Sequence, residues 1–146
     1  MDTILVVNAG SSSVKFQVFA IGLSGELTRQ IKGQMGGIGT RPRLRACGPD
    51  DTSIVDRKYD AETISSVPAA LHAAAAWLRE EQQINPTAVG HRVVHGGPDY
   101  DRPVLIDTEV LARLERYTSL APLHQPHNLA PIRSILARFP QLPQVA

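Results

Sequence analysis

An uninterrupted apolar run close to the start of the chain constrains the fold more than any other feature. Residues 4–7 read ILVV and are followed directly by Asn-Ala-Gly, which is the pattern of a short strand buried on both faces and ending in a turn. Val14, Phe16 and Val18 then recur at every second position, and this period predicts a second strand. The chain therefore begins with two strands of a sheet, joined by a turn of three serines.

The remaining sequence changes between β-like and helical patterns. Weaker β-like segments are separated by glycines or by a Pro-Asp-Asp turn, and they predict a curled antiparallel extension of the sheet at residues 27–35, 44–46 and 53–57. Apolar residues then recur at helical spacing. We expect helices over residues 61–83, 108–117 and 129–138, with a strand over residues 88–95 between the first two.

Capping residues indicate where the later helices begin. Asp107 or Thr108 is expected to cap the second helix, and Asn128 the third. Pro131 would then fall in the first turn of the third helix, where its missing N–H costs little. Residues 145–146 resemble the opening of a further strand. The order of elements predicts an α/β fold, a mixed β-sheet with packed helices that is truncated before its last strand.

Composition narrows the range of functions. The 146 residues are 42% apolar, which suits one globular domain. The net charge of +1 supplies no overall field that would attract nucleic acid or an anionic membrane. Cys47 is the single cysteine and cannot form an internal disulfide, and the N-terminus lacks the pattern of a signal peptide. We therefore expect a cytoplasmic protein that binds neither nucleic acid nor a membrane and holds any anion by local groups.

The serine turn carries groups that bind phosphate. Residues 8–15 read NAGSSSVK, so serine hydroxyls and backbone N–H groups converge at one end of the sheet beside the ammonium group of Lys15. A Walker A loop is excluded, because Val14 precedes the lysine and a strand follows it. Lys15 is expected to point away from the apolar face of its strand. A plain hairpin with a solvated lysine is the alternative.

A second candidate site lies in residues 90–97, which read GHRVVHGG. In a strand that continues to residue 95, Arg92 and Val94 share one face, opposite to His91 and His95. A guanidinium can hold both oxygens of a small carboxylate while valine covers a methyl tail. A salt bridge at the sheet edge is the alternative for Arg92. The two histidines would lie roughly 13 Å apart, too far to share a metal ion, and are expected to pack or form hydrogen bonds.

These motifs resemble the signatures of the acetate kinase family, which belongs to the actin, sugar-kinase and Hsp70 fold superfamily. Residues 8–15 resemble the first signature nearly residue for residue, and residues 90–97 closely match the second. Residues 121–126 read APLHQP and are similar to the proline-flanked histidine segment of the family. The resemblance covers the whole chain, with departures at Gln125, where asparagine is usual, and at His127 and Pro131. It implies the N-terminal domain of an actin-like ATPase, or ribonuclease-H-like, fold.

The resemblance also implies roles for the nucleotide-binding residues. Asn8 would help to hold the metal ion, Mg²⁺ or Mn²⁺. Lys15 would contact the phosphates of ATP together with Ser11, Ser12 and Ser13.

A second set of implied roles concerns the acceptor substrate and catalysis. Arg92 would bind the substrate carboxylate and stabilise the transferring phosphoryl group, with His124 as a second catalytic residue near that group. Val94 and Leu123 would line the pocket for the methyl group. For His124, a helix-capping or surface histidine is the alternative.

The implied reaction is the reversible, Mg-dependent transfer of a phosphoryl group from ATP to acetate, which gives acetyl phosphate and ADP. Propionate kinase is the close alternative, and a truncated, inactive fragment that binds phosphate weakly is the other. The resemblance implies that residues 1–146 are an incomplete N-terminal acetate kinase domain. The second nucleotide-binding domain and the catalytic aspartate would lie outside it, and the full-length family is expected to form homodimers.

Overall fold

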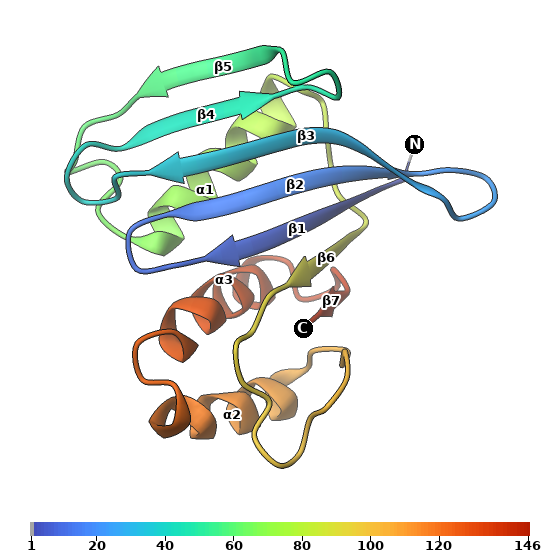
Figure 1. Ribbon diagram of the computed structural model, residues 1–146, viewed down its shortest axis with the longest axis vertical. Coiled ribbons are helices and arrows are strands. Elements are labelled where there is room, and N and C mark those ends of the chain that lie inside the picture. The colour runs from blue at the N-terminus through green and yellow to red at the C-terminus, as the bar shows by residue number, and fades with distance from the viewer. Residues whose placement is uncertain (1) are drawn as a thin grey trace.

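The computed structural model describes residues 2–146. A mixed sheet of seven strands forms its centre, in the order β5-β4-β3-β2-β1-β6-β7 (Figure 1). The strands are β1 (Thr3–Ala9), β2 (Val14–Ile21), β3 (Leu27–Gly36), β4 (Arg43–Cys47), β5 (Ser53–Lys58), β6 (Ala88–His91) and β7 (Gln144–Val145). The helices are α1 (Val67–Glu80), α2 (Thr108–Arg116), α3 (Gln125–Arg138) and the short 3₁₀ helix η1 (Tyr117–Leu120). The predicted α/β class is confirmed.

The N-terminal strand lies inside the sheet. β1 pairs antiparallel with β2 on one side and parallel with β6 on the other. From β1 to β5, each strand pairs antiparallel with the next one in the sequence, which confirms the predicted antiparallel extension. The strand expected to open at residues 145–146 is β7, which begins one residue earlier and pairs parallel with β6.

The two faces of the sheet differ in chemistry and in cover. One face carries the buried apolar side chains, and α1 and α3 lie behind it (Figure 1). On that face Phe16 of β2 packs at a tilt against Trp77 of α1, with ring centroids 6.4 Å apart. Because successive side chains of a strand project to opposite faces, the intervening side chains lie on the other face of the sheet. Over β1 to β5, no helix among residues 2–146 covers that open face.

α1 is shorter at both ends than the predicted helix over residues 61–83. It begins behind Ser66, whose hydroxyl oxygen accepts a hydrogen bond from the N–H of Ala69 at 3.2 Å. The segment before Ser66 forms turns, and the C=O of Ile64 accepts the N–H of Gly39 at 2.8 Å. Alanine favours a helix throughout this region but carries no information on where the helix begins.

α2 begins where the sequence predicts, with Asp107 as its cap. Oδ1 of Asp107 accepts the N–H of Val110 at 2.7 Å. α2 packs against α3 in a second apolar cluster, which contains Ile106, Leu111, Leu114, Leu129 and Ile132. Among residues 2–146, no helix has the length and apolar character that crossing a membrane requires.

The start of α3 corrects a prediction. The helix begins at Gln125, so the expected start at residue 129 behind an Asn128 cap is wrong. His124 is the N-cap residue, and its side chain makes no capping hydrogen bond. Pro126 occupies the first turn, and Pro131 lies inside the helix. Asn128 does not cap because its carboxamide bonds two backbone groups outside the helix.

β6 ends at His91, so the strand predicted over residues 88–95 is too long. Arg92 keeps one last backbone hydrogen bond to β1, and the chain then leaves the sheet. Gly97 has a positive φ of 59°, and its N–H donates to Nδ1 of His95 at 2.8 Å. The prediction that Arg92 and Val94 share one face of a strand is therefore wrong, because the N–H of Val94 bonds the side chain of Asn128 and not β1.

Candidate functional site

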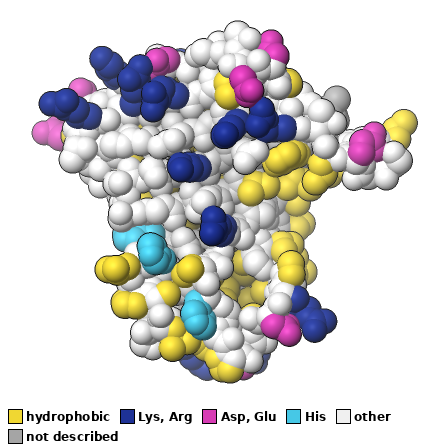
Figure 2. Space-filling model, in the orientation of Figure 1, with side chains coloured by type: hydrophobic (Ala, Val, Ile, Leu, Met, Phe, Trp, Pro, Cys, Tyr) yellow, Lys and Arg dark blue, Asp and Glu magenta, His cyan; other side chains and the backbone are white. Residues whose placement is uncertain are grey.

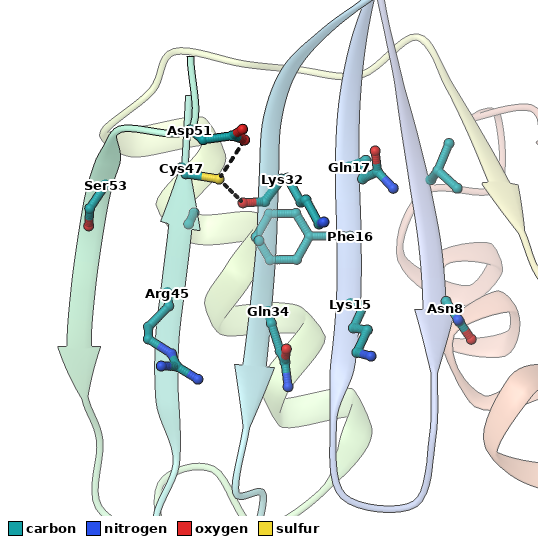
Figure 3. A pocket seen from close by; sticks show the side chains of 13 residues that line it. Asn8, Lys15, Phe16, Gln17, Lys32, Gln34, Arg45, Cys47, Asp51 and Ser53 are labelled. Carbon is teal, nitrogen blue, oxygen red and sulfur yellow. Dashed lines mark hydrogen bonds between the residues drawn. The ribbon is translucent and has the colours of Figure 1, made fainter. Parts of the chain in front are cut away.

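One row of polar side chains crosses the open face of the sheet near the serine turn. Asn8 of β1 lies opposite Lys15 of β2, and Lys15 lies opposite Gln34 of β3. Gln34 in turn lies opposite Arg45 of β4. Because directly opposed residues project to the same face of a sheet, these four side chains follow one line across it (Figure 3). The predicted orientation of Lys15, away from the apolar face, is confirmed.

This row lines an open groove of about 620 Å³. Lys15, Lys32 and Arg45 contribute three cationic groups to its lining, and Asp51 contributes a carboxylate. That carboxylate already pairs with Arg29 at 2.8 Å. On the same side of the molecule, Figure 2 shows Lys and Arg side chains over the upper strands and in the centre, with histidines and hydrophobic side chains below them. The local excess of positive charge suits an anion.

The serine turn follows β1 at the end of this row. The N–H of Gly10 donates to the C=O of Ser13 at 2.9 Å, and the C=O of Ser12 accepts the N–H of Ile38 at 3.1 Å. The turn is therefore fixed both internally and by the loop after β3. Ser11 and Ser12 are exposed, and Ser13 is half-buried. The exposed hydroxyls of Ser11 and Ser12, on a fixed backbone three to four residues before Lys15, can donate to phosphate oxygens.

Arg92 lies beside Asn8 at the end of β6. The register sets His91 opposite Val7, and the N–H of Arg92 donates to the C=O of Val7 at 3.1 Å. Residue 92 therefore comes next to residue 8, at about the 4.8 Å that separates neighbouring strands. Arg92 is exposed, and no ion pair of its guanidinium with any of residues 2–146 is present. The sheet thus brings Asn8 of β1 and Lys15 of β2 close to Arg92, the residue that directly follows β6.

Val94, Leu123 and His124 lie on the surface of the described part of the chain. Val94 is 49% exposed and Leu123 is 77% exposed, so neither is enclosed as expected for a methyl pocket. His124 is exposed at the N-cap of α3. These residues come from the segment after β6 and from the start of α3, two parts of the chain that buried amide side chains connect.

The site offers limited coordination for a metal ion. Among residues 2–146 there is no cluster of three or more His, Cys, Asp or Glu side chains that could hold one. Mg²⁺ prefers oxygen ligands and usually keeps several waters and phosphate oxygens around it. The carboxamide of Asn8 lines the groove beside Lys15. It therefore fits one ligand position of a metal held mainly by phosphates and water.

A half-buried histidine supports the end of β6. Nε2 of His91 lies 2.6 Å from Oε1 of Gln144 in β7, and Nε2 of Gln144 donates to the C=O of Ile132 in α3 at 3.3 Å. Burial lowers the pKa of His91 from 6.5 to about 4, and the hydrogen bond to Gln144 offsets this only in part. His91 is therefore neutral near pH 7. The prediction that His91 and His95 form hydrogen bonds is confirmed.

Two amide side chains of α3 hold the segment after β6, and sequence reasoning missed both roles. Gln125 is fully buried, and its Nε2 donates to the C=O of His95 at 2.9 Å and to that of Leu114 at 3.0 Å. Asn128 bonds the neighbouring residue, Val94. Residues three apart share one helix face, so a pair of amides at this spacing in an apolar stretch was a signal for such a role.

Comparison with known proteins gives one consistent result. The model of the acetokinase family matches residues 3–146. The acetate kinases of Nitrobacter hamburgensis and Rhizobium meliloti are 69% and 58% identical over 146 residues, which are 100% of this chain but 36% and 37% of those proteins. The chain therefore spans little more than a third of the length of these relatives.

Solved structures agree with the sequence match. The acetate kinase of Porphyromonas gingivalis has a TM-score of 0.84 and 30% identity, over 99% of this chain and 36% of that one. A propionate kinase from Francisella tularensis subsp. tularensis has a TM-score of 0.84 and 31% identity, over 100% of this chain and 36% of that one. The fold is thus the actin-like ATPase fold predicted from the sequence. Because the family model matches nearly the entire sequence, this chain belongs to the acetokinase family.

Proposed function

We propose that the protein containing residues 1–146 is an acetate kinase, which transfers a phosphoryl group reversibly between ATP and acetate. The observation that carries this proposal is the row that Asn8 of β1, Lys15 of β2 and Arg92, the residue directly after β6, form at one end of the sheet beside the serine turn. Such a row supplies a metal ligand, a phosphate-binding cation and a carboxylate-binding cation within side-chain reach. Relatives named acetate kinase, up to 69% identical, support acetate as the acceptor.

Each residue has a distinct part in this reaction. Lys15 acts as a point charge on the nucleotide phosphates, while the serine hydroxyls and turn N–H groups donate to their oxygens. The planar guanidinium of Arg92 holds the acetate carboxylate through two parallel hydrogen bonds and then meets the charge that spreads over the phosphoryl oxygens. When bound, Mg²⁺ or Mn²⁺ neutralises charge on the nucleotide phosphates, with Asn8 as one ligand. His124 contributes a further polar group near the phosphoryl oxygens.

The proposal extends to the whole protein. We expect residues 1–146 to be its N-terminal domain, with most of the adenosine site in a second domain, and we expect a cytoplasmic homodimer. Phosphoryl transfer depends on positioning and on charge stabilisation by groups around the metal and phosphates. The residues of this chain therefore supply one side of a shared site.

Lys15→Ala tests the proposal in the protein that contains residues 1–146. Because the ammonium group acts on the nucleotide phosphates, we expect the KM for ATP to rise far more than the KM for acetate. Lys32→Ala is a matched control, since Lys32 lines the same groove in the next row from the serine turn. Steady-state kinetics with both substrates decide the matter. A loss confined to the acetate KM of Lys15→Ala, or an equal loss in Lys32→Ala, would contradict the role of Lys15.

Propionate kinase activity is the second candidate. It is favoured by the propionate kinase among the structural neighbours and by the exposure of Val94 and Leu123, which do not enclose a pocket limited to one methyl group. Val94→Ala should shift specificity toward propionate with a similar kcat, because bulk in an apolar pocket changes discrimination by about 1–3 kcal/mol per methylene. Kinetics with acetate and propionate measure this shift. An unchanged ratio of the two kcat/KM values would remove Val94 from the substrate site.

A further inference from the structure

The side chain of Asn128 connects two parts of the candidate site that are distant in sequence. Asn128 lies inside α3 and is 8% exposed. Its Nδ2 donates to the C=O of Ala9, the last residue of β1, at 2.9 Å. Its Oδ1 accepts the N–H of Val94 at 2.9 Å. One end of the carboxamide therefore bonds the residue after Asn8, and the other end bonds the segment after β6.

The carboxamide occupies the place of a missing backbone hydrogen bond. In a parallel ladder, bonds repeat at every second residue along each strand. The N–H of Arg92 bonds the C=O of Val7, so the next bond would join the N–H of Val94 to the C=O of Ala9. Asn128 accepts from the first of these groups and donates to the second. Its amide is thus inserted between the two strands and holds them apart at the end of the sheet.

A buried amide in a helix is costly unless both of its ends are hydrogen-bonded. Here both ends are bonded, and neither partner belongs to α3. Nε2 of Gln125, on the same helix face, donates a hydrogen bond to the C=O of His95, the residue after Val94. The segment that leaves the sheet after β6 is therefore fixed by helix side chains instead of by a neighbouring strand.

We infer that Asn128 is a positioning residue, which sets the separation between the end of β1 and Val94. The end of β1 carries Asn8 and leads into the serine turn, on the side of metal and phosphate. Val94 is on the side of the acetate methyl group. This inference rests on the proposed function, because the separation matters only if both substrates bind there. Transfer is sensitive to such alignment.

Two substitutions, made in the protein that contains residues 1–146, distinguish the effects of the two hydrogen bonds of Asn128. Asn128→Asp keeps an oxygen for the N–H of Val94 and loses the donor to Ala9, whereas Asn128→Ala loses both bonds. At a temperature at which all variants are folded, Asn128→Ala should lower kcat and raise the acetate KM, each by about tenfold or more. Asn128→Asp should lower kcat by about tenfold and leave the acetate KM within about twofold.

Ser66→Ala is the control, because it removes a helix cap at the start of α1 without touching β1 or the segment after β6. It should change neither constant. Wild-type kcat and acetate KM in both folded Asn128 variants would overturn the assignment, and so would an equal kinetic loss in Ser66→Ala. If Asn128→Ala does not fold, the kcat of Asn128→Asp alone supports or overturns it. A wild-type protein that forms no acetyl phosphate overturns the proposed function itself, and the assignment with it.

Discussion

At the scale of single residues, Arg92 combines an exposed guanidinium with a fixed backbone. Its N–H bonds Val7, and the preceding residue, His91, is anchored to Gln144. The side chain is thus presented from a rigid point while its charge stays free of any ion pair among the described residues. The sequence identified Arg92 as a candidate cation, and the structure places it on the surface, but the strand face that it was expected to share with Val94 does not form. The sequence could not predict that Asn8 would be the neighbour, because that depends on the pairing of strands distant in sequence.

We expect Arg92→Lys to be damaging although the positive charge is kept. An ammonium group cannot reproduce the two parallel hydrogen bonds of a guanidinium to a carboxylate. The value of kcat/KM for acetate should fall by about a hundredfold or more, equivalent to roughly 3 kcal/mol of transition-state stabilisation. Steady-state kinetics of the variant measure this fall. Wild-type kcat/KM in Arg92→Lys would mean that Arg92 has a structural role.

At the scale of elements, β6 and α3 show where sequence patterns reach their limit. Both elements were expected, but β6 ends earlier and α3 begins earlier than predicted. Asparagine before an apolar stretch normally indicates a cap, and at Asn128 the same carboxamide is used for tertiary hydrogen bonds. The local sequence does not show whether an asparagine caps a helix or bonds a distant part of the chain. The strands from β1 to β5 were predicted well because alternation and turn residues are local signals.

The stability of the protein should depend on pH through His91, which connects β6 to β7 and, through Gln144, to α3. Its folded pKa of about 4 lies below the unfolded value near 6.5, so the unfolded chain binds the extra proton more tightly. The stability that the folded protein gains by keeping His91 neutral is complete above pH 6.5 and is lost as the pH falls toward 4. The free energy of unfolding should decrease by on the order of 3 kcal/mol across that range.

Denaturant unfolding at several pH values measures this decrease. The variant His91→Gln should lose most of the pH dependence between 6.5 and 4, because glutamine does not titrate. Exposed His124 provides the control, and His124→Gln should keep the wild-type pH dependence. If the free energy of unfolding changes equally with pH in His91→Gln and in the wild type, the folded protein does not hold His91 neutral, and this prediction is wrong.

At the scale of the whole molecule, the fold class could be predicted from the order of strand and helix patterns, and the family from short motifs that resemble its signatures. What could not be predicted was the exposure of the two residues that we propose to lie beside the methyl group of acetate. Val94 and Leu123 are exposed, and exposure depends on every neighbouring element. The positive groove on the open face was also unexpected, because its cations come from β2, β3 and β4 and are far apart in sequence.

We expect the purified 146-residue chain to have no measurable acetate kinase activity. The family resemblance implies that the adenosine site and a catalytic aspartate lie outside these residues, and transfer fails without such groups. Acetyl phosphate formation by the chain can be compared with that of its Lys15→Ala, Arg92→Ala double variant. A rate clearly above the double variant would show that residues 1–146 contain a working site.

The parallel pairing of β1 with β6 has a consequence for the order in which the protein matures during translation. β2 to β5 each pair with the strand made just before them, so these hairpins can form as soon as they leave the ribosome. β1 must wait for its second neighbour: Thr87 bonds Thr3 across 84 residues, and Asn128 bonds Ala9 across 119. Until then the nascent chain displays an apolar strand edge that can pair wrongly. The β1–β2 hairpin that carries Asn8, the serine turn and Lys15 can therefore form early, whereas its contacts with the segment that carries Arg92 and Val94 must form later.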